Sequence, residues 1–569
     1  MMENKRGKPT SDEGATSRTQ TAPTFDSTLF QEAASTLYPL GKAGAEDHAR
    51  GDIIGQRYRV QRVYRGGMGL VYIVENLAGL QQEKSLALAL KTFQNRFLWD
   101  EEANRRFERE AMQWINLELH PHIVFAFLVE RIEGRPYLWL EFVDGESLAE
   151  RMARRPPGVM ETINLALQFS RGMRHAYEKH GLIHRDIKPA NCLLTKEGVL
   201  KICDFGLSKL RAEMLARGGG SFRYSAVSTQ AGVLVGTPAY IPPEAIRNAD
   251  KADIRGDVYS FGVMLYEMLT GRPLFRGPDV LAQQMKVNPA APSTINADVP
   301  HALDLFVLKC LEKAPERRFA SFADVEVELE KIGGQLGGAM PKYERPVSIP
   351  EWGREFMKAY TLMEFGKPEE AAAAFRHILE SAPREAEVHN NLGLCLAQSG
   401  RLGEACESTR RAVDLKPDYA EAWANLGGYL GRRGLFAKGI EACDRAIAVK
   451  PRWAEAHANR GANLAGLGRF EEAAACFERA LRANPKYWKA NIMAAESLAR
   501  SGGKPEEVLR LVERALEINP KDAEGLAMAA ACLNDLGRRS DAERYLGLAE
   551  AVGPDSPLVR RVGEVMRKD

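Results

Sequence analysis

Hydrophobic and polar positions alternate with different periods along the chain. Between residues 53 and 93, short runs such as YRVQRVY, GLVYIVEN and LALALKTF are rich in β-branched and aromatic residues and predict strands. The segment EEANRRFEREAMQWINLEL has the apolar spacing of a helix, and two further strand-like runs follow it. Helical spacing then predominates to about residue 334. The pattern therefore predicts a small β-rich lobe followed by a larger α-helical lobe.

Beyond residue 350 the pattern becomes repetitive. Segments such as NLGLCLAQSGRLGEACESTRRAVDLKP recur, each ending at a proline 34 or 35 residues from the next. A period of about 34 residues is the signature of tetratricopeptide repeats, and these segments resemble that family. The resemblance implies an all-α solenoid of five to six two-helix repeats, with PLVRRVGEVMRK as a capping helix. The repeated prolines are Pro383, Pro417, Pro451, Pro485, Pro520 and Pro554.

Two sets of glycines recur within each repeat. Glycine readily takes the left-handed conformation found just past a helix end, which predicts that the first helix of a repeat stops at one set. The other set has no side chain and so lets the two helices of a repeat approach closely. The expected stops are Gly400, Gly434 and Gly468, and the expected close approaches are at Gly393, Gly427 and Gly461.

Composition sets the outer boundaries of these regions. The N-terminal segment is rich in Thr, Ser, Ala and charge, with few bulky apolar residues, and predicts a disordered tail. Glycines and prolines in IGGQLGGAMPKYERPVSIP disfavour regular structure and predict a linker. The expected regions are a tail at 1–52, a two-lobed domain at 53–334, a linker at 335–350 and repeats at 351–569.

Charge and cysteine content narrow the functional classes. With 78 basic and 76 acidic residues the net charge is +2, so no general attraction to nucleic acid is expected. The eight cysteines form no C-x-x-C motif, and those in the repeats are expected to be small buried hydrophobes. No apolar run suits a signal peptide or a membrane span, so we expect a cytoplasmic protein.

Two motifs carry the chemistry. LIHRDIKPANCLL resembles the catalytic loop of protein kinases, and KICDFGLSK follows at the spacing of the metal-binding Asp-Phe-Gly motif. The chain is identified as resembling bacterial Hanks-type serine/threonine kinases. That resemblance implies an α+β bilobal kinase fold, with ATP and Mg²⁺ as cofactors and a protein as the substrate.

The resemblance assigns roles to residues of these two motifs. Asp186 is expected to accept a hydrogen bond from the substrate hydroxyl and orient it, and Lys188 to place a positive charge on the transferred phosphoryl group. Asn191 and Asp204 are expected to hold Mg²⁺, which prefers hard oxygen ligands. Phosphoryl transfer depends mainly on alignment and charge neutralisation, and these residue types supply both.

Further nucleotide-site residues follow from the resemblance. Lys91 resembles the lysine that contacts the α and β phosphates, with Glu110 as its expected partner. YLWLEFVDGESL resembles the hinge between lobes, with Leu140 as gatekeeper. Glu141 to Val143 are expected to face adenine, and Ala89 to line the same site.

The stretch VYRGGMGLVY resembles a glycine-rich phosphate-covering loop. Gly66 and Gly69 match its second and third glycines, whereas Tyr64 replaces the first. We expect this replacement to weaken ATP affinity at most, because a side chain there restricts the backbone and crowds the nucleotide. The other residues assigned to this loop are Val63, Gly67 and Val71.

The segment after Asp-Phe-Gly is predicted to be regulatory. In the family, an arginine in the position of Arg185 receives a phosphate carried by this segment. Its candidate phosphorylation sites are Ser225, Ser228, Thr229 and Thr237, with Thr229 favoured.

Five further residues are expected to support the fold. Glu244 is expected to pair with Arg318 in a buried ion pair, and Asp257 to brace the catalytic loop. His184 and Phe205 are expected to pack as part of a structural spine rather than to react.

The predicted function is transfer of the γ-phosphoryl of ATP to protein serine or threonine, with the repeats recruiting a protein partner or substrate. A scaffold that does not turn over ATP is the alternative; the substituted glycine favours it and the intact charged residues oppose it. A third possibility is that the repeats dock on the kinase and inhibit it.

Overall fold

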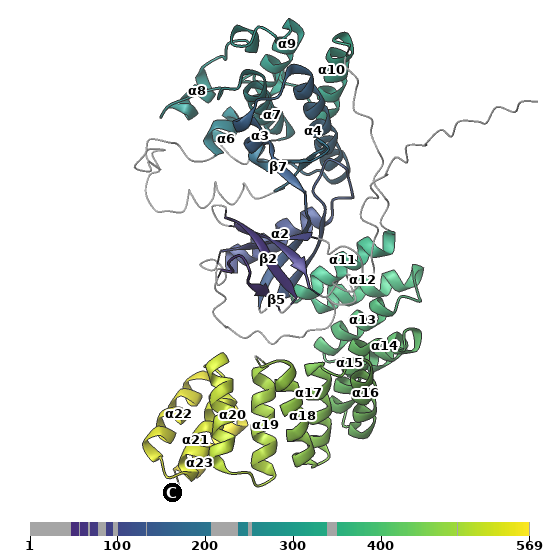
Figure 1. The fold of residues 1–569 in the computed structure, drawn as a ribbon, viewed down its shortest axis with the longest axis vertical. Helices are drawn as coiled ribbons and strands as arrows, with labels where there is room; N and C mark the ends of the chain where they lie inside the picture. Colours follow the sequence, from purple (N-terminus) through teal and green to yellow (C-terminus); the bar gives the residue numbers. More distant parts are fainter. Residues whose placement is uncertain are drawn as a thin grey trace, which may run out of the picture.

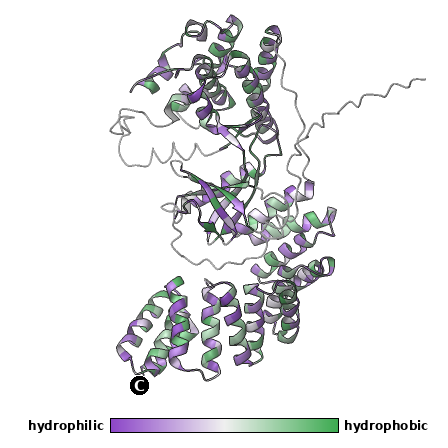
Figure 2. Ribbon diagram, viewed as in Figure 1, coloured by the Kyte–Doolittle hydropathy of each residue, from purple (hydrophilic) through white to green (hydrophobic). Residues whose placement is uncertain are grey.

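The chain folds into two lobes and a helical arc in the computed structural model (Figure 1). The small lobe, built on a β-sheet, lies between a large α-helical lobe and the arc. Hydrophobic segments occur in both lobes and in the helix pairs of the arc (Figure 2). The structure describes residues 47–55, 57–65, 69–77, 87–94, 101–132, 134–205, 237–247, 253–337, 350–485 and 487–567.

The small lobe is an antiparallel sheet with strand order β1-β2-β3-β4-β6-β5, so β5 is an edge strand. Successive side chains of a strand point to opposite faces. In β4, Leu88 and Leu90 join one apolar cluster and Ala89 joins the other, so both faces of the sheet are buried. The strands are β1 (Ile53–Ile54), β2 (Tyr58–Arg65), β3 (Gly69–Asn76), β4 (Ala87–Phe93), β5 (Ala126–Ile132) and β6 (Arg135–Glu141).

Helix α2 (Glu101–Ile115) packs beside this sheet, and the large lobe follows β6. The core of the large lobe is helical, and α7 in it is buried along nearly its whole length. A small sheet of order β7-β8-β9 borders the space between the lobes. The elements are β7 (Gly145–Ser147), α3 (Leu148–Arg154), α4 (Val159–His180), β8 (Cys192–Thr195), β9 (Leu200–Ile202), α6 (Pro243–Arg247), α7 (Ile254–Thr270), α8 (Val280–Lys286), α9 (His301–Cys310) and α10 (Phe322–Gln335), with short 3₁₀ turns η3 (Pro189–Asn191), η4 (Thr237–Tyr240), η6 (Pro292–Thr294) and η7 (Pro315–Arg317).

The arc consists of paired antiparallel helices, as the 34-residue period predicts. The described helices form six pairs and a final single helix, α23. They are α11 (Glu351–Glu364), α12 (Pro368–Ser381), α13 (Ala386–Gln398), α14 (Leu402–Leu415), α15 (Ala420–Arg432), α16 (Phe436–Val449), α17 (Ala454–Gly466), α18 (Phe470–Ala483), α19 (Trp488–Arg500), α20 (Pro505–Ile518), α21 (Ala523–Asp535), α22 (Arg539–Val552) and α23 (Pro557–Met566).

Both glycine predictions for the repeats are confirmed. Gly400, Gly434 and Gly468 follow the first helix of their pairs with φ of 77°, 76° and 75°. A Cβ atom at position 427 would lie 2.4 Å from Cys443 Sγ, so any other residue there would force the two helices of the repeat apart or displace Cys443. The five repeat cysteines are buried, as expected.

The arc is joined to the small lobe by packing as well as by the chain. Helix α11 lies along edge strand β5 and touches α2. Phe356, Met357 and Tyr360 of α11 belong to the same apolar cluster as Tyr58 and Trp139 of the sheet. The outer face of the sheet and the first repeats therefore share one hydrophobic core.

Two boundaries differ from the prediction. Residues 47–52, expected in the tail, contact the sheet: Asp47 pairs with Arg135 at 2.9 Å, and the His48 backbone NH donates to the Tyr72 hydroxyl. Helix α10 continues through Gly333 and Gly334 to Gln335, because tertiary packing outweighs the low helix propensity of glycine. Residues 1–46 and 338–349 lie outside the described residues. Within the described ranges, no helix is both long and apolar enough to cross a bilayer.

The junction between the small lobe and the arc predicts a pH-dependent stability. Burial raises the pKa of Glu364 to about 8 and that of Glu130 to about 7, from an ordinary 4.5, although hydrogen bonds and charge from Arg131 and Arg57 oppose the shifts. At pH values between 4.5 and these raised pKa values, the two carboxyl groups keep protons in the folded chain that they release in the unfolded chain. Stability contributed by these groups is therefore complete below pH 4.5 and falls as the pH rises to about 8.

Glu364→Gln removes one of these titrations and keeps an oxygen acceptor. We expect the melting temperature of the unaltered chain to fall more steeply between pH 5 and 8 than that of Glu364→Gln. Scanning calorimetry of both proteins at several pH values measures this. Parallel curves would contradict the expectation.

Candidate active site

A cavity of about 610 Å³ lies between the two lobes. Its walls include apolar side chains from both, among them Val71 and Ala89 from the sheet and Leu193 from β8. Charged residues from both lobes line it too. No described residue of the helical arc lines this cavity, so the docked repeats do not occlude it.

The predicted catalytic residues converge on this cavity. Asp186 follows α4 in a loop, and its carboxylate Oδ2 accepts hydrogen bonds from Lys188 Nζ at 2.6 Å and Asn191 Nδ2 at 3.1 Å. The other oxygen, Oδ1, is buried without a hydrogen-bond partner among the described residues. A buried acceptor in a cavity wall is available to a hydroxyl group.

The loop that carries Asp186 is held by a buried carboxylate. Asp257 at the start of α7 accepts the backbone NH of His184 at 2.7 Å and that of Arg185 at 2.8 Å. Arg185 has φ of 64°, a strained conformation for a residue with a side chain, and these two bonds stabilise it. The bracing role predicted for Asp257 is thus seen in the geometry. Burial raises the pKa of Asp257 to about 7, while those two backbone bonds oppose the shift.

His184 and Phe205 pack as the sequence suggested. The ring centroids are 4.8 Å apart, and both side chains are buried. His184 Nε2 lies 3.0 Å from the Cys203 carbonyl, and burial lowers the pKa of the imidazole. A neutral, buried ring with a main-chain partner is suited to packing rather than to reaction.

Lys91 has a partner that differs from the expected one. Its ammonium lies 2.6 Å from Asp204 Oδ1 and 5.3 Å from the centre of the Trp114 ring. The expected partner, Glu110, lines the same cavity, but the ion pairs between described residues do not include Lys91 with Glu110. The reason is tertiary: the turn after β9 brings Asp204, whose φ is 64°, against β4.

The pairing with Lys91 keeps Asp204 ionised. Burial alone would raise the pKa of Asp204, but the charge and hydrogen bond of Lys91 outweigh burial, and the charge of Lys188 acts in the same direction. The pKa therefore lies below its ordinary value. An ionised carboxylate at Asp204 and the amide oxygen of Asn191 line the same cavity, and both are hard oxygen donors of the kind that Mg²⁺ binds.

The predicted hinge lines the cavity as expected. Leu140, Glu141 and Val143 contribute to the wall, and Glu141 is positioned by an ion pair with Lys201 at 2.8 Å. The Glu141 backbone NH donates to the Phe125 carbonyl at 2.9 Å. These two contacts hold the first residue of the hinge, at the end of β6, in place.

The glycine-rich loop departs from the prediction at Val63. Val63 lies opposite Tyr72 in the sheet register, and both pack on the face that meets the repeats. Because neighbours in a strand face opposite sides, it is Tyr64 and Val71 that face the cavity. Gly69 also lines it, whereas Gly66 and Gly67 lie outside the described residues.

The regulatory segment is only partly described. Ser225, Ser228 and Thr229 lie outside the described residues, whereas Thr237 begins η4.

Glu244 and Arg318 form a bidentate ion pair. The two terminal nitrogens of Arg318 donate hydrogen bonds to the two carboxylate oxygens of Glu244, each at 2.7 Å. The Arg318 side chain is fully buried. This is the ion pair predicted from the sequence.

Sequence reasoning missed several residues of the cavity. Trp114 lies one helical turn beyond Glu110 on α2, and this i, i+4 spacing could have indicated it. Cys203 adjoins Asp204 and was also detectable. Phe107 and Leu193 carried no local signal, because only the packing of α2 and β8 brings them to the wall.

The residues fit ATP and a divalent metal. Apolar side chains near the hinge suit an aromatic base, and Lys91, Lys188, Asn191 and Asp204 gather at the same cavity. Asn191 Nδ2 donates a hydrogen bond to the Asp186 main-chain carbonyl at 2.8 Å, and this leaves the amide oxygen of Asn191 to act as a metal ligand.

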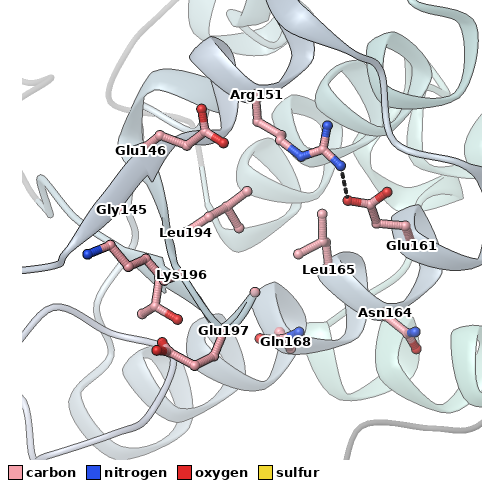
Figure 3. A pocket seen from close by; sticks show the side chains of 12 residues that line it. Gly145, Glu146, Arg151, Glu161, Asn164, Leu165, Gln168, Leu194, Lys196 and Glu197 are labelled. Atoms are coloured by element: carbon pink, nitrogen blue, oxygen red, sulfur yellow. Dashed lines mark hydrogen bonds and ion pairs between the residues drawn. The ribbon is translucent and has the colours of Figure 1, made fainter.

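A second hollow of about 720 Å³ lies beside this cavity on the large lobe (Figure 3). It shares Gly145 and Glu146 with the cavity. Its charged side chains include Arg151 and Glu161, which form an ion pair at 2.9 Å. Lys196 and Asn164 line this hollow too, but its described lining contains no aspartate, and we assign it no chemistry.

Comparison with known proteins agrees with the geometry. Residues 59–326 match the protein kinase domain family, and residues 356–419, 459–523 and 499–562 match tetratricopeptide repeat families. The predicted bilobal fold followed by a repeat solenoid is therefore confirmed.

Similar proteins include bacterial serine/threonine-protein kinases. PknL of Mycobacterium tuberculosis is 32% identical over 310 residues, which are 54% of this chain and 72% of PknL. PknB of Mycolicibacterium smegmatis is 33% identical over 294 residues, 49% of this chain and 43% of PknB. Pkn1 of Myxococcus xanthus is 32% identical over 286 residues, 49% of this chain and 38% of Pkn1. The chain belongs to the protein kinase family, as a serine/threonine kinase whose kinase domain is followed by tetratricopeptide repeats.

Proposed function

We propose that the protein transfers the γ-phosphoryl group of Mg-ATP to serine or threonine hydroxyls of a protein bound by its repeats. The observation that carries this proposal is the buried Oδ1 of Asp186, which has no hydrogen-bond partner among the described residues and lies in the same cavity as Lys91 and Asp204. We further propose residues 53–334 as the body of the kinase domain, with residues 47–52 and Gln335 packed onto it or continuing its last helix, and 351–569 as the repeat domain.

Each residue has a defined task in this proposal. ATP and Mg²⁺ supply the phosphoryl group and neutralise its charge when bound. Asp186 Oδ1 accepts a hydrogen bond from the substrate hydroxyl and orients it, while Lys188 places its charge beside that carboxylate. Lys91 binds phosphate oxygens, and Asn191 and Asp204 supply oxygen ligands to the metal.

The remaining walls of the cavity bind the base of the nucleotide. Val71, Ala89, Leu140 and the hinge from Glu141 to Val143 enclose it between the lobes, in a wall that is mostly apolar. Glu110 lines the same cavity as Lys91, and its carboxylate adds negative charge to the wall.

The concave face of the solenoid is proposed as the surface that recruits a protein. Repeat solenoids present extended concave surfaces because each pair of helices is rotated slightly from the last. The described helices curve in this way beneath the small lobe (Figure 1). No nucleic-acid partner is proposed, because basic and acidic residues are nearly equal in number.

Transfer of labelled γ-phosphate tests the proposal. The full chain is incubated with labelled ATP and a generic basic protein, with Mg²⁺ or with a chelator. We expect label on serine or threonine with Mg²⁺ and none with the chelator. Label on tyrosine, or no label from protein that binds nucleotide, would contradict the proposal.

Tyr64 provides a separate prediction about nucleotide affinity. Tyr64 lies within strand β2 and is 51% exposed. Positive φ among described non-glycine residues occurs only at Arg185 and Asp204, so the backbone at 64 needs no glycine. We expect Tyr64→Gly to change the Kd for ATP less than about threefold, as is usual for an exposed side chain. We also expect it to lower stability by about 0.5–1 kcal/mol.

Titration calorimetry with ATP and urea denaturation measure the two quantities. A tenfold or greater gain in affinity in Tyr64→Gly would instead mean that the tyrosine blocks the nucleotide site.

A further inference from the structure

Edge strand β5 is covered by the first helix of the solenoid through a matched pair of polar groups. The Val129 backbone NH donates to Thr361 Oγ1 at 3.1 Å, and the Arg131 backbone NH donates to Glu364 Oε2 at 2.8 Å. Two residues along a strand span about 6.6 Å and three residues of a helix rise about 4.5 Å, and the longer Glu364 side chain makes up the difference, so Thr361 and Glu364 reach alternate amides of β5. The unpaired edge of the sheet is thereby closed by the repeat region.

The Arg131 side chain extends this contact to a third element. Its Nε donates to the main-chain carbonyl of Glu364 at 2.9 Å, at the end of α11 where carbonyls lack partners within the helix. Its terminal nitrogen lies 3.8 Å from Glu108 Oε1 on α2. One guanidinium therefore bridges the solenoid, the sheet edge and α2.

Helix α2 carries cavity residues on a different side from Glu108. At 100° per residue, Glu110 and Glu108 are separated by 200° around the helix axis. Glu110 and Trp114 line the nucleotide cavity, and the Lys91 ammonium lies 5.3 Å from the Trp114 ring centre. A rotation of α2 that broke its contact with Arg131 would therefore move Trp114 relative to Lys91.

A second contact holds the far end of the same helix. Glu118, three residues beyond the end of α2, pairs with Arg354 of α11 at 3.4 Å. Met357 of α11 and Leu117 belong to the wall of a 380 Å³ cavity at this seam. Helix α11 thus contacts the segment after α2 directly through Arg354, and it is linked to the middle of α2 through Arg131 of β5.

We infer that the first tetratricopeptide repeat is a positioning element of the kinase active site. Arg131 and Glu364 hold α2 at the angle that places Glu110 in the wall of the nucleotide cavity and the Trp114 ring beside Lys91. This inference rests on the proposed nucleotide-binding role of Lys91. It makes the docked repeat a requirement for activity, which is the opposite of the inhibitory docking that the sequence left open.

The test uses full-length variants on both sides of the seam. Arg131→Met removes the bridge from the kinase side, and Glu364→Leu removes it from the solenoid side. Glu364→Gln is the matched control, because it keeps an oxygen acceptor for the Arg131 amide. Arg171→Met controls for loss of a buried ion pair elsewhere, since Arg171 pairs with Glu326 at 2.9 Å in the large lobe.

We expect Arg131→Met and Glu364→Leu each to lower kcat/KM for ATP roughly tenfold or more, because small displacements of a positioned group are costly. The loss should be mainly in KM, and the double variant should lose little more than either single variant because both break one linkage. Glu364→Gln and Arg171→Met should remain within about threefold of the unaltered chain.

Amide hydrogen exchange provides a readout that does not depend on turnover. Exchange in residues 101–115 should be several-fold faster in Arg131→Met and Glu364→Leu, and unchanged in the two controls. Absence of phosphoryl transfer in the unaltered chain would refute the proposed function, while exchange would still test the linkage. Unchanged exchange and unchanged KM in Arg131→Met and Glu364→Leu, or equal losses in Arg171→Met, would overturn the inference.

Discussion

Asp186→Asn is expected to lower kcat for phosphoryl transfer by roughly 10²- to 10⁴-fold, the usual contribution of a positioned acid–base group. The carboxylate Oδ2 accepts hydrogen bonds from Lys188 and Asn191, while Oδ1 is buried and no described residue donates to it, which leaves it to accept a hydrogen bond from a hydroxyl. An amide at this position has one oxygen where the carboxylate has two. It would either lose the bond to Lys188 or present an NH₂ group to the substrate hydroxyl.

Steady-state assays with labelled ATP measure this effect, and nucleotide titration separates it from binding. The Kd for ATP should change little, because the contacts proposed for phosphate come from Lys91 and the metal ligands. Asp144→Asn is the matched control: Asp144 is an exposed carboxylate of the large lobe that pairs with Lys196 at 2.5 Å. Activity in Asp186→Asn comparable to that of Asp144→Asn would refute the assignment.

Arg318→Met is expected to destabilise the large lobe by about 3 to 5 kcal/mol, the cost of leaving one member of a buried ion pair uncompensated. The Arg318 side chain is fully buried and donates to both oxygens of Glu244. It also donates to the carbonyls of Arg255, Glu312 and Lys313. Its loss therefore leaves several buried acceptors without a donor.

Urea denaturation of the full chain, followed by a probe in the large lobe, measures the loss. Lys331→Met serves as the control, because Lys331 forms an exposed pair with Glu328 at 3.2 Å and such pairs contribute at most about 1 kcal/mol. Combining Arg318→Met with Glu244→Leu should recover part of the loss, since the uncompensated carboxylate is then gone. A loss in Arg318→Met no larger than in Lys331→Met would refute this account.

Local motifs explain why much of the active site could be predicted. Asp186, Lys188 and Asn191 lie within six residues, so the chain between them fixes their separation before any tertiary contact forms. The repeats were predictable for a related reason: each 34-residue unit contains its own glycine stop and close approach, and both occur where expected.

Contacts between distant elements were not predictable in this way. Lys91 and Asp204 are 113 residues apart, and their pairing depends on how the turn after β9 meets β4. The sequence around Val63 would be the same whether its side chain faced the cavity or the repeats. Only the register with Tyr72 turns it toward the repeats. In both cases a pattern along one strand does not specify which surface that strand will meet.

The kinase fold, the catalytic motifs and the repeat solenoid were predictable from the sequence, because each depends on residues that lie close together along the chain. How the two parts join depends on contacts between distant residues. Thr361 and Glu364 have no distinctive spacing as a motif, and the residues they contact lie 232 and 233 positions earlier. Their role arises because β5 is the open edge of a sheet, and a helix placed along that edge satisfies amides that would otherwise lack partners.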